Sequence, residues 1–194
     1  MRQTALILIT LLISTIISLP TYAAWQLDNK SSQLNFTSVK KGSVAENHYF
    51  STIKGDINQQ AQINISVDLS SVKTNIAIRD ERMKTFLFET KKFSSAEFTA
   101  QLDNSLIKTL KVGEPQLVSV NGSLNFHGFK QAITIEVSVV KLSADKLLVN
   151  TIKPFFIKAD AFGLVAGINK LKSLAALPSI NHVVPVSFSV IFTR

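Results

Sequence analysis

The stretch from Ala61 to Gln101 reads AQINISVDLSSVKTNIAIRDERMKTFLFETKKFSSAEFTAQ and decides the fold. Its first ten residues alternate between polar side chains and the apolar side chains of Ala61, Ile63, Ile65, Val67 and Leu69. Successive side chains on a strand point to opposite faces, so this pattern predicts one strand with a buried face and a solvated face. Alternation resumes at residues 97–102, where we expect a second strand.

The segment IRDERMKTFLFET, residues 78–90, lies between these two strands and fits no strand pattern. It is rich in charge, and Ile78, Arg82 or Met83, and Phe86 follow one another at the spacing of a helix. This segment is therefore predicted to form a short helix across the mouth of a barrel.

The rest of the chain supplies further strands. We expect them at residues 25–28, 34–37, 49–57, 105–112, 117–126, 133–139, 146–157 and 184–192. Residues 38–48 are polar and are predicted as a loop, and residues 159–178 as a loop with one or two helical turns. Regular strands with short turns indicate a single all-β domain, either an antiparallel sandwich or an up-and-down barrel of about eight strands.

Glycine and proline mark the irregular points of these strands. Gly55 and Gly122 each interrupt an alternating strand, which predicts a bulge or a tight bend at both positions. His127 and Gly128 begin a hairpin turn, and Pro154 is expected to bend the strand that contains it.

The N-terminus has the layout of a secretory signal peptide over residues 1–23. Arg2 precedes an apolar run from Thr4 to Leu19, and a small residue, Ala23, follows as the expected cleavage point. An uncleaved membrane anchor is the alternative, but about 16 apolar residues are short for a bilayer that needs about 20. We expect an exported protein whose β domain covers residues 24–194, located in the periplasm if the source is a Gram-negative bacterium.

Charge and cysteine content narrow the functional classes. The chain has no Cys, so its fold uses no disulfide and no thiol chemistry. Without Arg2, 20 Lys and Arg stand against 13 Asp and Glu, a formal charge of +7. The positive charge favours anionic partners such as a membrane surface, whereas its dispersal and the expected export argue against nucleic acid.

Residues typical of an enzyme or metal site do not form a pattern. His48, His127 and His182 are far apart in sequence and are expected in turns or at strand edges, and no metal site is predicted. No nucleophile elbow, metalloprotease motif or phosphate loop is present. Arg79, Asp80 and Arg82 form the densest polar cluster. They either meet an anionic or carbonyl head group at the barrel mouth or tie the helix to the barrel rim, and the second interpretation is slightly favoured.

The apolar strand faces admit two interpretations: side chains that fill a core, or the lining of a tunnel. Eight strands can enclose either a packed interior or one small ligand. The chain contains 13 Phe but one Trp and two Tyr, an apolar lining with few polar groups. Each buried CH₂ contributes about 0.8 kcal/mol, so such a surface suits a long hydrocarbon chain.

Several segments resemble the YceI-like family. Trp25-Gln-Leu-Asp28 resembles its W-x-I-D opening, and residues 50–57 resemble its F-x-G-x-[FI] segment. Residues 74–98 resemble its T-x-x-x-x-R-D-x-x-L-x-x-x-D-F-F-D segment and the K-[YF]-P that follows. Residues 120–128 resemble V-x-G-x-L-T-[IL]-x-G, and residues 160–164 resemble the late D-F-G segment.

The likeness covers the mature chain in order but includes departures. Glu81-Arg82-Met83 replaces the usual His after R-D-x, Phe86-Leu-Phe-Glu89 replaces D-F-F-D, and Lys30-Ser31 replaces an early His-Ser. These changes affect the expected head-group contacts more than the tunnel.

The resemblance implies a lipocalin-like β-barrel that is exported and carries a polyisoprenoid, either an isoprenoid quinone or a polyprenyl phosphate, without acting as an enzyme or needing a cofactor. The expected tunnel residues are Phe36, Ile63, Ile65, Val67, Met83, Phe86, Phe98, Leu124, Phe126, Ile133, Ile135, Val137, Phe162, Phe188 and Val190. The expected head-group residues are Arg79, Asp80 and Arg82. Two alternatives remain: a filled barrel that acts as a stress or protein-interaction module, and a lipid-modifying hydrolase. Homodimer formation is also left open.

Overall fold

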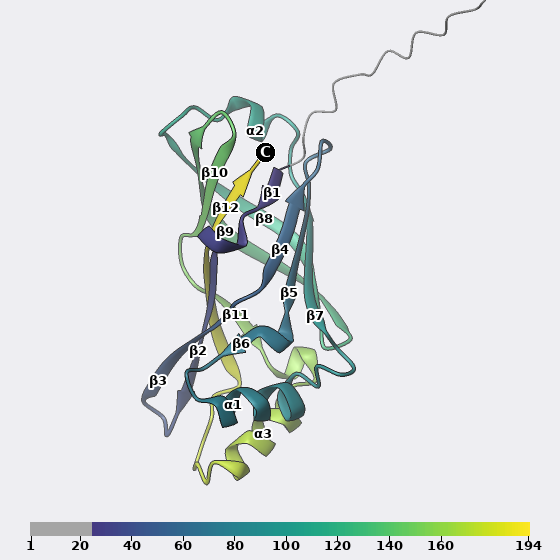
Figure 1. Cartoon of the computed structure of the whole chain (residues 1–194), viewed down its shortest axis with the longest axis vertical. Helices are drawn as coiled ribbons and strands as arrows, with labels where there is room; N and C mark the ends of the chain where they lie inside the picture. The colour runs from purple at the N-terminus through teal and green to yellow at the C-terminus, as the bar shows by residue number, and fades with distance from the viewer. Residues whose placement is uncertain (1–24) are drawn as a thin grey trace, which may run out of the picture.

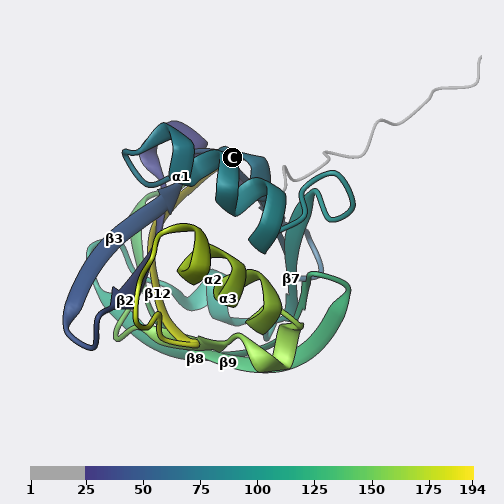
Figure 2. The same ribbon diagram turned by 90° about the horizontal axis from the view of Figure 1, so that it is seen from below.

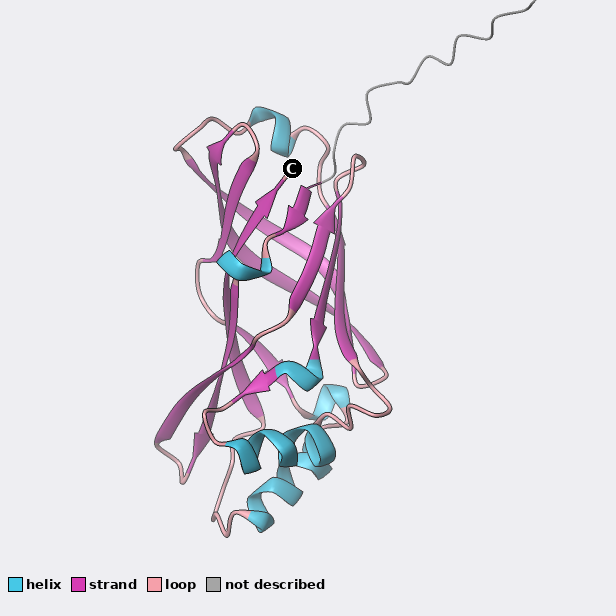
Figure 3. Ribbon diagram, viewed as in Figure 1, coloured by secondary structure: helices cyan, strands magenta, loops and turns pink. Residues whose placement is uncertain are grey.

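The computed structural model describes residues 25–194 and is built mainly from strands (Figure 3). They are β1 (Trp25–Leu27), β2 (Gln33–Lys40), β3 (Val44–Phe50), β4 (Ile53–Ile57), β5 (Gln62–Asp68), β6 (Val72–Lys73), β7 (Ser95–Gln101), β8 (Pro115–Phe126), β9 (Phe129–Ser143), β10 (Lys146–Thr151), β11 (Phe155–Lys158) and β12 (Val183–Thr193). The helices are α1 (Ala77–Arg82), α2 (Leu106–Thr109) and α3 (Val165–Leu174), the π-helix η3 (Met83–Leu87), and the 3₁₀ turns η1 (Asn29–Ser31), η2 (Leu69–Ser71) and η4 (Asp160–Phe162).

The strands form one antiparallel barrel (Figure 1). Hydrogen bonds run through β1, β4, β5, β7, β8, β9, β10 and β12, and the pairing of β12 with β1 closes the ring. Closure leaves this ring without an exposed edge. The sequence-based prediction of an antiparallel barrel of about eight strands is confirmed.

Several barrel strands are broken into two shorter ones that pair differently. The turns η1 and η2 separate β1 from β2 and β5 from β6, and residues 152–154 separate β10 from β11. Past these breaks, β2 and β11 flank the first half of β12, and β6 pairs with β3. No strand pairing joins β11 to β9 or β6 to β7 within residues 25–194. The barrel is therefore continuous in one half, whereas in the other half it has two seams, meaning gaps between neighbouring strands that do not pair. The bend predicted at Pro154 lies at one of the breaks.

The helices α1, η3 and α3 cover the divided end of the barrel, while α2 lies at the opposite end (Figures 1 and 2). We call these the helical end and the α2 end. The helix predicted within residues 78–90 is present as α1 followed by η3. A Cβ at Gly167 of α3 would lie 2.5 Å from the carbonyl oxygen of Phe86 and 2.8 Å from Cα of Leu87. Glycine thus permits α3 to pack directly against η3.

Three local predictions were wrong. Residues 38–48 are not a loop, because β2 continues to Lys40 and β3 begins at Val44. Residues 105–112 contain the short helix α2 rather than a strand, since Leu106, Ile107 and Leu110 all turn toward the barrel interior at helical spacing. Residues 159–178 contain ten residues of helix in α3, more than the turn or two expected.

Gly55 and Gly122 do not mark bulges, because strand register is regular through both. A Cβ at Gly122 would lie 2.3 Å from the ring of Phe98, and one at Gly55 would lie 2.5 Å from Cδ1 of Ile65. Each glycine instead makes room for a large inward side chain of the neighbouring strand.

Candidate functional site

The interior of the barrel contains a cavity of about 240 Å³ that runs from α2 to the helical end. It is lined by 38 residues, every one of them Leu, Ile, Val, Phe or Ala. An apolar cavity of about 150 Å³ can stay dry and take up a small hydrocarbon, so this larger one can do the same. The barrel interior is therefore not completely filled by side chains.

Most predicted tunnel residues lie on the wall of this cavity. They are Phe36, Ile63, Ile65, Val67, Phe98, Leu124, Phe126, Ile133, Ile135, Val137, Phe188 and Val190. Their common position on inward strand faces follows from alternation. Whether they contact a ligand remains a prediction.

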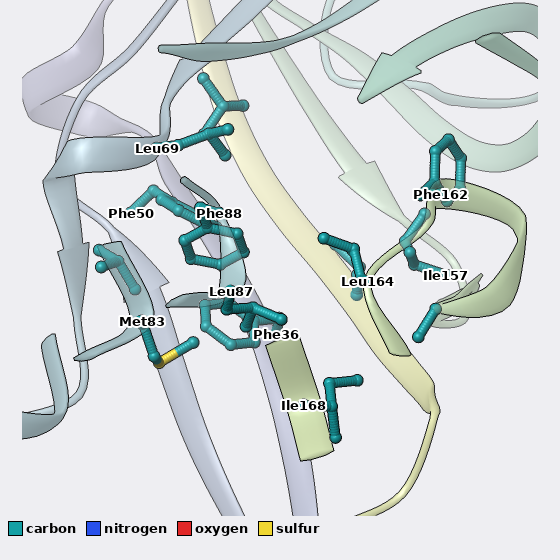
Figure 4. Close-up of a cluster of buried hydrophobic side chains, with 14 of the residues drawn as sticks. Phe36, Phe50, Leu69, Met83, Leu87, Phe88, Ile157, Phe162, Leu164 and Ile168 are labelled. Atoms are coloured by element: carbon teal, nitrogen blue, oxygen red, sulfur yellow. The ribbon is translucent and has the colours of Figure 1, made fainter. Parts of the chain in front are cut away.

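Three predicted tunnel residues lie off the wall. Met83 and Phe162 are buried in the packing of the helical end (Figure 4). The ring of Phe162 lies 5.5 Å from that of Phe126. Phe86 is 39% exposed on the outer side of η3, with Nζ of Lys170 5.7 Å from its ring. Helix packing rather than strand alternation decides these positions.

The wall also includes residues that the sequence analysis did not select. Strand examples are Phe50, Val118 and Val139, which the same alternation rule could have identified. Leu106, Ile107 and Leu110 close the α2 end, whereas Leu87 and Ile168 contribute from η3 and α3. The α2 residues could not be found while that segment was predicted to be a strand.

A row of aromatic rings crosses the barrel at the helical end. Centroids lie 5.3 Å apart for Phe36 and Phe50, 5.7 Å for Phe50 and Phe88, and 6.0 Å for Phe88 and Phe126. Phe162 continues the row, and Figure 4 shows Phe36, Phe50 and Phe88 gathered beside Met83 and Leu87. Rings at these spacings attract one another beyond their simple burial. The row links β2 and β3 to β8 across the divided half of the barrel.

A polar cluster lies next to this aromatic row, at the tip of the β2–β3 hairpin. Arg79 donates hydrogen bonds from Nη1 to Glu46 Oε2, 2.8 Å away, and from Nη2 to the carbonyl oxygen of Thr74, 2.6 Å away. Lys40 Nζ lies 2.7 Å from the same Glu46 oxygen. Both cations hold the pKa of Glu46 below its ordinary value, the hydrogen bond with Lys40 being the largest cause. Arg79 thus ties α1 to the barrel rim.

Asp80 and Arg82 also have structural partners. The buried carboxylate of Asp80 accepts hydrogen bonds from the backbone N–H of Thr74, at 2.8 Å, and from the Thr74 hydroxyl. Arg82 Nη1 lies 3.3 Å from the carbonyl oxygen of Leu174 in α3. The three predicted head-group residues therefore do not converge on the cavity wall: Arg79 and Asp80 fasten the start of α1, and Arg82 joins α1 to α3.

His48 also belongs to this cluster, and the expectation that it lies in a turn or at a strand edge was wrong. It faces inward on β3, is only 3% exposed, and has its ring 5.1 Å from that of Phe36 on the cavity wall. Nε2 forms a 2.8 Å hydrogen bond with Ser38 Oγ, whereas Nδ1 has no hydrogen-bond partner among residues 25–194. Its two-residue spacing from Phe50 was the available signal, because Phe50 also faces the cavity.

Burial lowers the pKa of His48 to about 4, with a further contribution from the charge of Arg79. The imidazole is therefore neutral near pH 7. Nε of Arg79 is likewise buried and without a hydrogen-bond partner in the described part of the chain. Lys40 and Arg79 carry two positive charges, and Glu46 and Asp80 carry two negative ones. The cluster has no net formal charge and retains two unsatisfied polar atoms.

The other two histidines lie elsewhere. His127 is at the β8–β9 hairpin, with Nε2 2.9 Å from Glu89 Oε2 and its ring 4.4 Å from that of Phe93, and His182 is exposed before β12. Within residues 25–194, no group of three or more His, Asp or Glu side chains is placed to hold a metal ion.

Comparison with known proteins identifies the family. The YceI-like domain matches residues 25–192, so the chain belongs to the YceI-like family. A polyisoprenoid-binding domain from Saccharophagus degradans, implicated in plant cell wall breakdown, is 38% identical. It covers 88% of this chain and 98% of its own, with a TM-score of 0.86. No curated protein sequence gives a significant match.

More distant solved structures share the fold. Burkholderia cenocepacia BcnA is 17% identical, with a TM-score of 0.67 over 85% of this chain and 98% of its own. The Campylobacter jejuni YceI protein is 14% identical, with a TM-score of 0.56 over 76% of this chain and 84% of its own.

The predicted signal peptide, residues 1–23, lies outside the described residues, as does the expected mature start at Ala24. Among residues 25–194, no helix has both the length and the apolar character that a membrane crossing requires.

Proposed function

We propose that this protein is exported and binds a polyisoprenoid lipid, holding the hydrocarbon chain in the barrel cavity without chemically changing it. The observation that carries this proposal is a cavity that extends between the two ends of the barrel and has a wholly apolar wall. A hydrocarbon chain needs no specific partner along its length, and each CH₂ removed from water contributes about 0.8 kcal/mol. The similarity to a polyisoprenoid-binding domain over nearly the whole of that domain supports the same ligand class.

The unfilled cavity favours this function over a filled barrel that serves only as an interaction module. The aromatic row and the polar cluster lie together at the helical end, and the α2 end is closed by apolar side chains. A long lipid with one polar terminus would therefore place that terminus beside His48 and its chain toward α2.

Within this class, the cluster suits an uncharged polar head group such as a quinone carbonyl. Neither His48 nor Arg79 lines the cavity, but the neutral His48 ring lies 5.1 Å from that of Phe36 on the cavity wall. Nδ1 of His48 is buried and unsatisfied, so it would gain from a head group that displaced the neighbouring side chains and reached it. A phosphate would bring negative charge to a cluster whose Lys40 and Arg79 are already matched by Glu46 and Asp80. Burying an uncompensated charge is costly, so polyprenyl phosphate is the less favoured ligand.

The first test is native mass spectrometry of the protein purified from its own host, followed by solvent extraction. We expect a stoichiometric mass excess that extracts as an isoprenoid quinone. A Trp at position 135 would project into the cavity from β9, so Ile135→Trp should abolish the excess while the barrel remains folded. Thr134→Trp, on the solvent side of the same strand, is the matched control and should retain the lipid.

Competition between an isoprenoid quinone and a polyprenyl phosphate of equal chain length tests the head group. Preferential retention of the quinone, reduced by His48→Phe, is the expected result. A bare protein mass that stays unchanged after incubation with both lipids would refute polyisoprenoid binding. Preference for the phosphate would refute only the assignment of a neutral head group.

A further inference from the structure

The outer surface of the helical end exposes apolar side chains. Ile78 is 59% exposed, Ile76 47%, Phe86 39% and Leu174 36%. Together with Arg82 and Lys170, these residues make up what we call the cap face. Single exposed apolar residues are ordinary, but several on adjoining helices of one surface indicate an interaction site.

Contacts between α3 and the α1–η3 segment bring these residues onto one surface. Arg82 bonds to the carbonyl oxygen of Leu174, and Lys170 lies over the ring of Phe86. The two helices therefore run side by side in opposite directions, held close by Gly167. Ile78, Arg82 and Phe86 follow one another at intervals of four, so apolar and basic side chains alternate across the cap face.

The charge of this surface is not balanced by carboxylates. Asp80 is buried, and Glu81, which is exposed, pairs with Lys84 at 2.9 Å. No carboxylate within the described residues forms an ion pair with Arg82, Lys170 or Lys172. The segments that build the helical end, residues 38–47, 72–93 and 159–182, contain ten Lys and Arg against five Asp and Glu.

The α2 end gives a useful contrast because it also exposes apolar residues. Leu117 is 70% exposed and Val112 61%. Residues 103–117, however, contain two Lys and two acidic residues, and Lys111 and Glu114 lie 3.6 Å apart. The α2 end therefore has apolar exposure without an excess of positive charge.

We propose that the cap face docks on an anionic phospholipid bilayer. Short helices with apolar side chains between basic ones lie at the membrane interface, where the apolar groups enter the acyl boundary and the cations meet anionic head groups. This orientation would place His48 and the adjoining end of the cavity next to the bilayer. The inference goes beyond the proposed function, since it assigns a second, external lipid contact and the route by which a lipid would be exchanged.

Flotation with phospholipid vesicles tests this docking. The protein, expressed from its full sequence, should float with vesicles containing phosphatidylglycerol and much less with pure phosphatidylcholine. Binding should weaken as ionic strength rises, because salt screens exposed charges. Ile78→Asp combined with Leu174→Asp should lower vesicle affinity at least about tenfold, and Lys170→Glu should lower it several-fold. Val112→Asp combined with Leu117→Asp, the same change at the α2 end, should have little effect.

A fluorescence measurement locates the contact directly. Ile78→Trp should show a blue-shifted emission on anionic vesicles, whereas Leu117→Trp should not. Trp25 is the sole native Trp and is 5% exposed near the α2 end, so it contributes a constant background. Three results would overturn the proposal. They are binding to vesicles that contain no anionic lipid, equal emission shifts for the Trp at positions 78 and 117, and loss of vesicle binding in the α2-end variant. Cap-face variants that bind as strongly as the unchanged protein would overturn it as well.

The same variants separate this inference from the lipid-binding proposal. Ile78 and Leu174 do not line the cavity, so their Asp variants should keep the co-purified lipid in native mass spectrometry. An empty cavity in a protein that still docks on anionic vesicles would refute lipid binding alone. A protein that retains its lipid but does not bind anionic vesicles would refute only the proposal that the cap face docks on a membrane.

Discussion

The two ends of this barrel are closed by different physical means. At the α2 end the strands are hydrogen-bonded all the way round, and apolar residues such as Leu110, Val139 and Leu147 line the interior. At the helical end two seams divide the strands, and helices close the opening through an aromatic row and a polar cluster.

This difference shows how one fold can combine an apolar barrel interior with a polar cluster at one of its ends. Apolar burial is indifferent to pH and to the identity of a hydrocarbon ligand. A buried polar cluster is costly unless its groups are satisfied, but it can recognise a head group and respond to protonation. In the proposed binding mode, the helical end would supply the specificity for a head group, and the α2 end would contribute burial alone.

The largest expected effect comes from removing the buried carboxylate at the helical end. Asp80→Ala would leave the backbone N–H and hydroxyl of Thr74 without their acceptor and Arg79 with one neighbouring anion fewer. We expect a loss of about 3–4 kcal/mol in the free energy of unfolding, measured by denaturant titration. Glu81→Ala, an exposed neighbour, should cost less than about 1 kcal/mol. Equal losses in the two variants would show that the polar cluster does not stabilise this end.

Truncating a buried side chain at the α2 end tests how that end differs from the helical end. Leu147 is 1% exposed, so Leu147→Ala should cost about 3 kcal/mol through lost burial and a larger cavity. The cost should be the same at pH 7 and pH 5, because no titrating group lies in this cluster of apolar residues. A cost that changes strongly with pH would contradict a purely apolar closure.

Lowering the pH should reduce the free energy of unfolding through protonation of His48 at the helical end. Its pKa is about 4 in the folded protein and ordinarily about 6.5, so between these values the unfolded chain binds a proton that the folded chain does not. Stability contributed by the neutral imidazole is therefore complete above pH 6.5 and is lost as the pH falls toward 4. Lowering the pH from 7 to 4.5 should cost about 2–3 kcal/mol from this residue.

The melting temperature of His48→Gln measured across the same pH range checks this assignment. Its acid sensitivity should be clearly smaller than that of the unchanged protein, while His182→Gln, an exposed substitution, should leave the sensitivity intact. The lowered pKa of Glu46 contributes stability that is lost only as the pH falls below its ordinary value of 4.5. Identical pH profiles for His48→Gln and the unchanged protein would exclude His48 as the source.

The smallest effect is expected at Arg82. Its long 3.3 Å contact with the carbonyl oxygen of Leu174 is exposed, so Arg82→Ala should change the free energy of unfolding by about 0.5 kcal/mol or less. Arg79→Ala should cost about 2 kcal/mol, because it breaks a part-buried ion pair and a backbone contact. Similar costs at the two positions would mean that the hydrogen bonds of Arg79 add little to the rim.

The sequence alone determined the architecture and much of the cavity wall. Alternation at positions such as Ile63, Phe98 and Ile135 depends only on neighbours two residues away, and a strand with one apolar face must turn that face inward. Alternation alone left a sandwich and a barrel of about eight strands both open, and the resemblance to the YceI-like family favoured the barrel.

Only the tertiary structure decided how each end is closed. Residues 38–48 were predicted as a loop because their inward positions include Ser38, Glu46 and His48, so the apolar signal of a strand is missing. These polar groups can face inward because Arg79, from a helix more than 30 residues away, pairs with Glu46. The packing of α3 on η3 through Gly167, and the placement of Phe86 outside the cavity, likewise depend on contacts between distant segments. Local periodicity carries no information about such contacts, because the partner that satisfies a buried group is set by the fold as a whole.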